Sequence, residues 1–215
     1  MNYLEYRWRL ELPHDAYHLI DVEARALGLA WFASPWDLPS LEFLLTYPVP
    51  AVKVASACLT DIAFLEEIRA SGRPAILSTG MSTERQIKRA VAALGPDRLI
   101  LLWCRSNYPC PPSQLNLLAI RRLAELFPLC PVGYSGHETG LWTTLCAVVL
   151  GAVMVERHFT LDRASFGTDQ AASLEPPGLA KLVQQIRRWE QARGTGELGL
   201  IPEEQEALAK LRRVP

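Results

Sequence analysis

The 215-residue chain lacks several features that mark particular classes of protein. No apolar run reaches the roughly 18 residues of a membrane-spanning helix, and the first residues, MNYLEYRWRLEL, are too charged for a signal peptide. Neither charge is in excess, with 22 Lys and Arg against 23 Asp and Glu, so no polyanionic partner is indicated. We therefore expect a cytoplasmic protein that binds neither nucleic acid nor a membrane.

Paired cysteine motifs and repeats are also missing. The five cysteines include no Cys-x-x-Cys motif, and most of them lie in apolar runs, as reduced and buried thiols do. There is no internal repeat beyond an alternation of strand and helix, and no low-complexity linker. A single domain is therefore expected for a chain of this length.

The sequence does contain a regular alternation of apolar and amphipathic segments. Six short apolar runs predict buried parallel strands, at 29–34, 51–56, 75–80, 99–104, 131–135 and 152–159. The segments between them open on capping or acidic residues and mostly close on Gly or Pro, as amphipathic helices do. Strictly alternating strands and helices predict an α/β fold.

Polar side chains stand at the C-terminal end of each of these runs: Ser34, Ser56, Ser78 with Thr79, Ser106, Ser135 and His158. A doubly wound sheet gathers its ligand groups at one switch point, whereas a barrel collects them from many strand ends onto one face. We therefore predict a (β/α)8 barrel of the TIM type, incomplete, with about six βα units visible.

The whole chain, 1–215, is expected to be this single partial barrel domain. Residues 1–28 resemble the helix of a βα unit without its strand, so the strands that a complete barrel would have are expected to be missing at the N-terminus. Residues 176–215 predict two C-terminal helices that close the barrel.

Two histidines follow neighbouring predicted strands, His137 in PVGYSGHETG and His158 in VERHFTLD. Neutral imidazole is a common ligand of transition metals, and two imidazoles at adjacent strand ends can share one ion. A single histidine would be better explained as a core or turn residue, but the pair favours a site. His14 and His18 have no accompanying third ligand, so we expect them at a helix start or on the surface.

Lys53 lies inside an apolar strand, where a buried ammonium group needs an anionic partner. The run ILSTGMS places hydroxyls where a strand becomes a helix, which suits an anion, although it is also an ordinary turn sequence. Together these features predict a bound phosphate or carboxylate. The alternative is that Lys53 pairs with a buried acid such as Glu156.

Two further polar residues stand on loops after the predicted strands. Tyr108, in RSNYPCPP, could form a wall for a polar substrate, and Asp169, in FGTDQ, could bind hydroxyl groups or transfer a proton. Each also has a simpler interpretation, as part of a loop covering the rim or as an exposed carboxylate.

The segments KVAS, ILSTGM, CRSNYP, PVGYSGH and VERHFTLDRASFGTDQAASLEP, in this order, resemble the sialic acid synthase family, over about residues 15–210. That family comprises N-acetylneuraminate synthases and their relatives for legionaminic and pseudaminic acids. The resemblance implies a (β/α)8 barrel that condenses phosphoenolpyruvate with an N-acylated amino sugar, such as N-acetylmannosamine, and releases phosphate. It also implies a divalent metal, usually Mn²⁺, with Mg²⁺ as an alternative.

The resemblance implies a role for each matching position. His137 and His158 would bind the metal, and Tyr108 and Asp169 would hold the amino sugar, with Lys53 and Asp169 as catalytic residues. The positions implied for phosphoenolpyruvate are Ser34, Lys53, Ser56, Ser78, Thr79, Ser106 and Ser135.

The chain also departs from the family pattern. Ala57 and Cys58 stand where an acidic residue usually follows the lysine, and Gly136 replaces the usual Asp before His137. Trp103 replaces a common His, and Gln170-Ala171 replace a His-Lys pair. The first two strands of the family barrel and its C-terminal antifreeze-like domain have no counterpart.

These departures leave three hypotheses. The first is a synthase-type barrel that binds phosphoenolpyruvate and a metal. It is expected to be active only if the missing strands come from a partner, a homo-oligomer included, or from a wrongly truncated reading frame. The second is a degenerate, non-catalytic relative that binds a metal or small anions or acts as an assembly partner. The third is an unrelated metal-dependent aldolase or sugar isomerase, which would be expected to pair the histidines with carboxylate ligands.

Overall fold

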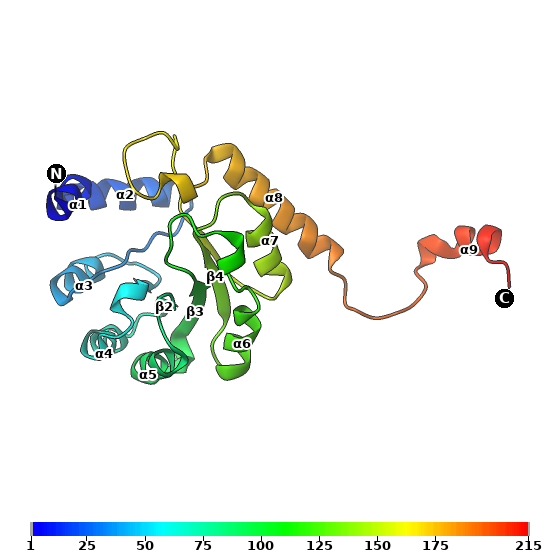
Figure 1. Ribbon diagram of the computed structural model, residues 1–215, viewed down its shortest axis with the longest axis horizontal. Coiled ribbons are helices and arrows are strands. Elements are labelled where there is room, and N and C mark those ends of the chain that lie inside the picture. The colour runs from blue at the N-terminus through cyan, green and yellow to red at the C-terminus, as the bar shows by residue number, and fades with distance from the viewer. Residues whose placement is uncertain (1, 215) are drawn as a thin grey trace.

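The computed structural model describes residues 2–214, and its centre is a curled parallel sheet (Figure 1). Its strands follow one another in chain order, each hydrogen-bonded to the next. They are β1 (Val52–Val54), β2 (Ala75–Ser78), β3 (Leu99–Cys104), β4 (Val132–Gly136) and β5 (Val155–Arg157). This arrangement is a half-barrel, which confirms the predicted α/β class.

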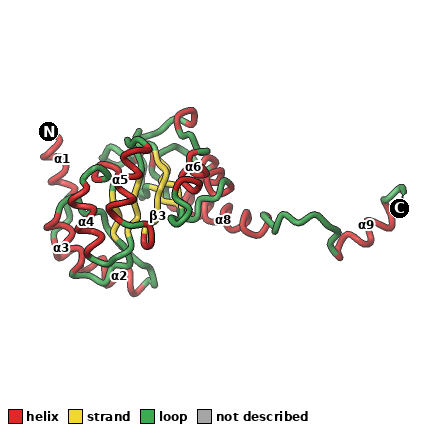
Figure 2. The backbone as a smooth tube through the Cα atoms, turned by 90° about the horizontal axis from the view of Figure 1, so that it is seen from below, coloured by secondary structure: helices red, strands yellow, loops and turns green. Residues whose placement is uncertain are grey.

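Helices cover the outer face of this half-barrel, and the strands lie inside them (Figure 1, Figure 2). After α1 (Tyr3–Leu10) and α2 (His14–Ala26), these are α3 (Leu38–Leu45), α4 (Ile62–Ala70), α5 (Glu84–Leu94), α6 (Ala119–Leu126) and α7 (Trp142–Val149). The chain continues into α8 (Pro176–Ala192) and α9 (Gln205–Leu211). Within the described residues, no helix is long and apolar enough to cross a membrane.

Local sequence explains where the covering helices begin and end. Helix α5 begins at a capping box, in which Thr83 accepts from the backbone of Gln86 while the Gln86 side chain accepts from the backbone N–H of Thr83. It ends before Gly95, whose φ of 76° most other residues avoid. Helix α4 begins after Asp61, which caps the N–H of Phe64.

The hydrophobic core lies between the sheet and these helices. Helix α4 contributes Phe64, Leu65 and Ile68, which share one helical face and are buried. All of β1 and β2 is buried, so their sequences are apolar at nearly every position rather than alternating. Lys53 is the charged exception within these strands.

One predicted strand is not formed. Residues 29–34 belong to no strand. A backbone hydrogen bond joins them to the sheet, in which the Lys53 N–H donates to the Ala33 carbonyl at 3.1 Å. A β-ladder needs successive backbone hydrogen bonds, and this segment lies beside the edge strand β1 without forming such a series. The expected burial of this run is also not observed, because Leu29 and Phe32 are exposed and no residue of 29–34 is buried. The expectation of six strands is therefore wrong, and the sheet has five.

Two predicted helices are divided differently in the structure. Between the runs 99–104 and 131–135, where one amphipathic helix is expected, Pro112–Gln114 form a short 3₁₀ turn and α6 starts only at Ala119. The single helix expected in residues 1–28 is two helices, because Pro13 precedes α2 and cannot donate an N–H to a continuing helix.

The C-terminal helices differ in their packing. Helix α8 packs against α7. Helix α9 lies apart, beyond an extended segment, and none of its residues is buried (Figure 1). The closing role of 176–215 and the single domain 1–215 stay predictions, and Met1 and Pro215 lie outside the described residues.

Candidate active site

A pocket of about 490 Å³ opens at the C-terminal ends of the strands. All of the predicted site residues except Thr79 and Asp169 line it. Its lining includes Ser34, Lys53, Ser56, Ser78, Ser106, Tyr108, Ser135, His137, Glu156 and His158. Every strand contributes to this end of the half-barrel, as the barrel prediction requires.

Lys53 is buried in the wall of this pocket, with 7% of its surface exposed. Its Nζ donates to Ser78 Oγ at 2.8 Å and to the Val54 carbonyl at 3.2 Å, and lies 3.7 Å from Glu156 Oε2. The alternative pairing with Glu156 is therefore present. The Glu156 side chain is 36% exposed and lines the same pocket, so this ion pair faces the cavity.

Further hydroxyl groups of the pocket pack around Gly80, which has no side chain to exclude them. Ser56 Oγ accepts from the Gly80 N–H at 3.0 Å and lies 3.3 Å from Cys104 Sγ. A Cβ on Gly80 would collide with Ser106 Oγ and would lie 2.9 Å from both Ser56 Oγ and Cys104 Sγ. The glycine of the STG segment is thus required by the close approach of polar atoms from the ends of β1 and β3.

Thr79 and Ser135 make different use of their hydroxyl groups. Thr79 is buried, and its Oγ1 donates to the Leu102 carbonyl at 3.0 Å, so the structure does not bring this side chain to the pocket. Ser135 lines the pocket and donates to Glu156 Oε1 at 2.7 Å.

The two histidines meet across the pocket, with ring centroids 5.3 Å apart. His137 Nδ1 lies 2.5 Å from the Arg105 carbonyl, which can only accept, so this nitrogen carries the proton and Nε2 keeps its lone pair. Burial lowers the pKa of His137, which keeps its ring neutral at pH 7. His158 Nδ1 lies 3.4 Å from Asp169 Oδ2, which leaves its Nε2 available as well.

Tyr108 packs against both imidazoles, tilted toward His137 with ring centroids 4.2 Å apart and edge-on to His158 with ring centroids 5.5 Å apart. Burial, together with the nearby Cys104, Asp169 and Glu156, raises the pKa of Tyr108 to about 12. Its phenol therefore stays protonated at neutral pH and can donate a hydrogen bond. Asp169 joins the site through His158 rather than by lining the pocket.

The donor set fits a divalent metal that takes two protein ligands. Both imidazoles are held through Nδ1 by an oxygen acceptor, which is the arrangement that orients histidine ligands in metal sites. Across the described residues 2–214, no group of three or more His, Cys, Asp or Glu side chains is arranged to hold a metal ion. Substrate or water would have to complete the coordination.

His14 and His18 lie outside this site. Both are exposed on α2, and the ring of His14 stacks on Phe43 with centroids 4.2 Å apart.

The model of the NeuB family matches residues 1–198. The chain belongs to the NeuB family. N-acetylneuraminate-9-phosphate synthase of Mus musculus is 40% identical over 213 residues, which are 98% of this chain and 59% of the mouse protein. N,N'-diacetyllegionaminic acid synthase of Legionella pneumophila is 36% identical over 87% of this chain and 54% of its own length. The chain thus spans a little over half of each of these relatives.

A solved structure is similar throughout. The N-acetylneuraminic acid (sialic acid) synthetase of Leptospira borgpetersenii serovar Hardjo-bovis, in complex with citrate, superposes with a TM-score of 0.85 at 35% identity. The match covers 95% of this chain and 73% of that one. The half-barrel is therefore the architecture of this NeuB family member.

Two departures from the usual NeuB pattern have a physical explanation. Trp103 points away from the pocket, because its Nε1 donates to the Leu115 carbonyl at 2.9 Å. A Cβ on Gly136 would lie 2.8 Å from both Arg157 Cδ and Glu138 Oε2. The usual Asp at this position would therefore force the buried side chains of Glu138 and Arg157 to shift.

Glu138 and Arg157 were not identified from the sequence, although each is adjacent to a site histidine. Burial alone would raise the pKa of Glu138, but hydrogen bonds from Thr144 and Tyr134 and the charge of Arg157 outweigh it, so this pKa is lowered. Burial lowers the pKa of Arg157, and Glu138 opposes that shift. The signal available in the sequence was the pair of dipeptides His137-Glu138 and Arg157-His158, in which a charged residue stands beside each site histidine.

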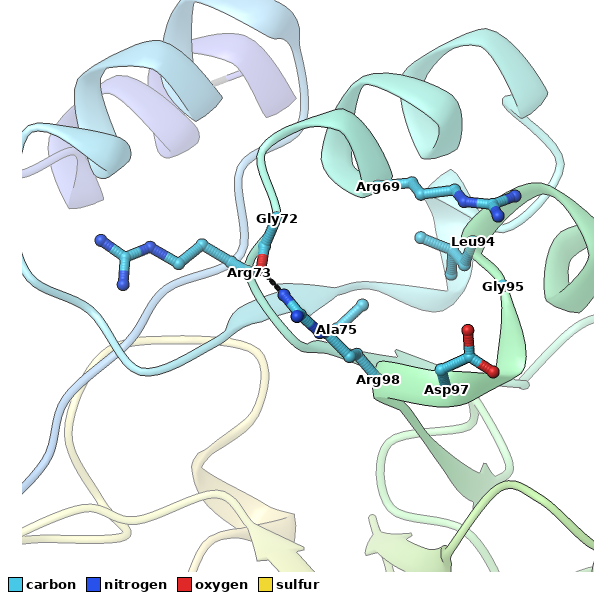
Figure 3. Close-up of a pocket in the computed structure, with 8 residues that line it drawn as sticks. All are labelled: Arg69, Gly72, Arg73, Ala75, Leu94, Gly95, Asp97 and Arg98. Carbon is cyan, nitrogen blue, oxygen red and sulfur yellow. Dashed lines mark hydrogen bonds between the residues drawn. The ribbon is translucent and has the colours of Figure 1, made fainter.

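A second cavity, of about 280 Å³, lies at the opposite end of the strands and is lined by Arg69, Arg73 and Arg98 (Figure 3). Arg98 Nη1 donates to the Gly72 carbonyl at 2.7 Å, and Arg69 Nη1 donates to the Ala93 carbonyl at 3.5 Å. Guanidinium groups at helix C-termini commonly satisfy such carbonyls. We therefore assign this cavity a structural role.

Proposed function

We propose that this chain binds phosphoenolpyruvate and a divalent metal and condenses phosphoenolpyruvate with an N-acylated amino sugar, releasing phosphate. One observation carries the proposal: Lys53 with its hydroxyl neighbours and the pair His137–His158 line a single pocket at the strand ends. An anion site beside a two-imidazole site is what this reaction needs.

Lys53 and the surrounding serines would hold the phosphate and carboxylate of phosphoenolpyruvate. The ammonium group and several hydroxyls offer donors to both anionic groups before the reaction begins, so they need little rearrangement during it. A divalent ion, Mn²⁺ or Mg²⁺, held by His137 and His158 would supply Lewis-acid polarisation of the sugar aldehyde. Tyr108 and Asp169 would contact the sugar.

The reaction balances without an oxidant or reductant. The methylene carbon of phosphoenolpyruvate forms a bond to the aldehyde carbon, whose oxygen becomes a hydroxyl by taking up one proton, equivalent to a proton that the attacking water gives up. Water adds to the second carbon of the former phosphoenolpyruvate, and phosphate leaves by cleavage of the bond between that carbon and oxygen. Glu156 would accept the proton from this water, since it is the carboxylate that lines the pocket, within 3.7 Å of Lys53.

Two further parts of the proposal concern the acceptor and the assembly. The relatives are named for N-acetylneuraminate 9-phosphate and diacetyllegionaminate, which supports an N-acyl amino sugar as acceptor. A second copy of the chain or a partner would complete the barrel at the two edge strands of the sheet, β1 and β5. We place this assembly in the cytoplasm.

A second candidate is a non-catalytic relative that binds a metal or small anions. The contact between Lys53 and Glu156 favours it, because the carboxylate offsets part of the positive charge offered to an anion. Both candidates bind a metal or an anion in this pocket, but only the first would convert phosphoenolpyruvate and release phosphate.

Phosphate release tests the proposal. The full chain is incubated with Mn²⁺, phosphoenolpyruvate and N-acetylmannosamine, its 6-phosphate, or a diacetylated amino sugar. We expect release with at least one acceptor, and His158→Ala should abolish it. His18→Ala is the matched control, because His18 is an exposed histidine outside the pocket. A folded chain that binds phosphoenolpyruvate but releases no phosphate with any acceptor would establish the second candidate.

A further inference from the structure

Each site histidine has a buried charged residue beside it in the sequence. Glu138 follows His137 and is fully buried, and Arg157 precedes His158 with a side chain that is 3% exposed. Neither residue lines the pocket. Their ionic contact, 3.5 Å from Arg157 Nη1 to Glu138 Oε1, therefore lies behind the two imidazoles.

The Glu138 carboxylate has a complete set of donors. Tyr134 donates to Oε2 at 2.8 Å, and Thr143 and Thr144 donate to Oε1 at 2.9 and 2.7 Å. These donors come from β4 and from the first turn of α7. Since all of these donors bind one carboxylate, the strand before His137 and the helix after it are both fixed to the Glu138 side chain.

The Arg157 guanidinium joins three segments of the chain. Nη2 donates to the Glu138 carbonyl at 2.6 Å and to the Ala172 carbonyl at 3.2 Å, while Nη1 donates to the Gly140 carbonyl at 3.0 Å. Nη1 also donates to Thr144 Oγ1 at 2.7 Å. The segments are the loop after His137, the strand before His158, and the turn that follows Asp169.

The backbone around the pair is built to admit it. Gly136 is the register partner of Arg157 in the β4–β5 ladder, and the absence of a side chain there gives the guanidinium stem its space. Arginine suits this position because its planar fork can serve several acceptors at once, which a lysine ammonium on a flexible stem does less well.

We propose that Glu138 and Arg157 are positioning residues that hold His137, His158 and Asp169 in one arrangement. This inference rests on the proposed metal site. The Arg157 guanidinium holds three backbone carbonyls at fixed positions, and so it sets the spacing of the two imidazoles and the contact between Asp169 and His158. Losing it separates the three segments without removing any group that touches the metal.

The test compares two variants with a control that lowers stability away from the site. Arg157→Lys keeps the positive charge that Glu138 needs but not the fork to three carbonyls, and Glu138→Gln keeps the side-chain size but not the charge. Leu123→Ala, a buried position on α6, lowers stability away from the site. The full chain is titrated with Mn²⁺, and melting temperatures are measured without metal.

We expect Arg157→Lys and Glu138→Gln to weaken Mn²⁺ binding roughly 10- to 100-fold, as loss of the groups behind metal ligands does. Leu123→Ala should lower the melting temperature and leave the Mn²⁺ affinity unchanged. A purely structural pair would instead give affinity losses that follow the melting temperatures in all three proteins. That outcome would overturn the proposal.

Hydrogen exchange of the metal-free protein gives a second readout. The Cys110 N–H donates to the His137 carbonyl at 2.9 Å, and the Leu174 N–H donates to the His158 carbonyl at 2.8 Å. Arg157→Lys should speed exchange at both amides relative to Leu123→Ala. Unchanged exchange refutes the positioning role whatever the chain binds, whereas failure of the unmodified chain to bind Mn²⁺ refutes the proposed function whatever the variants do.

Discussion

Replacing Lys53 by methionine distinguishes an anion-binding role from a structural one. The Lys53 side chain is 9% exposed, whereas that of its ionic partner Glu156 is 36% exposed and retains contact with water. Methionine has a similar volume and removes the need to desolvate an ammonium group. We therefore expect Lys53→Met to change the free energy of unfolding by no more than about 1 kcal/mol, or about 2–4 °C in melting temperature.

The same change should damage binding of phosphoenolpyruvate. A phosphate oxygen about 4 Å from Nζ interacts with it by about 4 kcal/mol at an effective dielectric constant of about 20. Part of this is offset by desolvation of the ligand, so we expect the dissociation constant to rise roughly 10²- to 10³-fold. Isothermal titration with phosphoenolpyruvate measures the change directly.

Lys88→Met is the matched control, because Lys88 is an exposed lysine on α5 paired with Glu84. It should leave both the affinity and, within about 1 kcal/mol, the stability unchanged. If Lys53→Met instead loses about 3–5 kcal/mol of stability and binds phosphoenolpyruvate as the unmodified chain does, Lys53 is a structural partner of Glu156. The reasoning would then be refuted.

Three further predictions concern the buried pair behind the histidines. The pKa of Glu138 is lowered from 4.5, so the stability that its carboxylate contributes is present above about pH 4.5 and is lost as the pH falls through the folded pKa. The unfolding free energy lost in Glu138→Gln should therefore shrink below about pH 4.5. A difference in unfolding free energy between the two proteins that stays constant with pH in denaturant titrations would contradict this. Arg157→Met removes the cationic partner of the buried Glu138 carboxylate and should cost about 3–5 kcal/mol in chemical unfolding. Arg187→Met, at the exposed pair with Glu190, should cost at most about 1 kcal/mol, and equal losses would refute burial as the cause. Gly136→Ala places a Cβ 2.8 Å from Arg157 Cδ and should cost about 1–3 kcal/mol, so an unchanged melting temperature would show that the pair can move.

The sequence predicts the repeating part of the fold well because that part depends on local patterns. The run LILLWC matches β3 residue for residue, and the capping signal before α5 marks its start within two residues. The run 29–34 has the same apolar pattern but forms no strand. A strand also requires a continuous hydrogen-bonded ladder with at least one neighbouring strand, and the sequence of one segment carries no information about its neighbour.

The pocket was predictable in part for the same reason. Parallel strands bring their C-terminal ends to one edge, so Lys53, His137 and His158 could be expected together. The direction in which a single side chain points could not be predicted. Thr79 follows Ser78 directly, yet it bonds a backbone carbonyl away from the pocket.

The buried pair shows what local patterns miss. Glu138 stands in the polar segment GHETG, which is typical of an exposed turn, and its partner Arg157 is 19 residues further along the chain (157 − 138 = 19). Their contact depends on the register of β4 with β5, and on the missing side chain of Gly136. Periodicity cannot predict such a contact, because it arises only once the sheet has formed.

Crystals of the chain grown with Mn²⁺ and phosphoenolpyruvate would test the central claim most directly, through the anomalous scattering of manganese. We predict an anomalous peak between His137 and His158, with the phosphate of phosphoenolpyruvate beside Lys53 and Ser78. A peak elsewhere, or a pocket that holds neither group at saturating concentrations, would contradict the claim that these strand ends form one site for a metal and an anion.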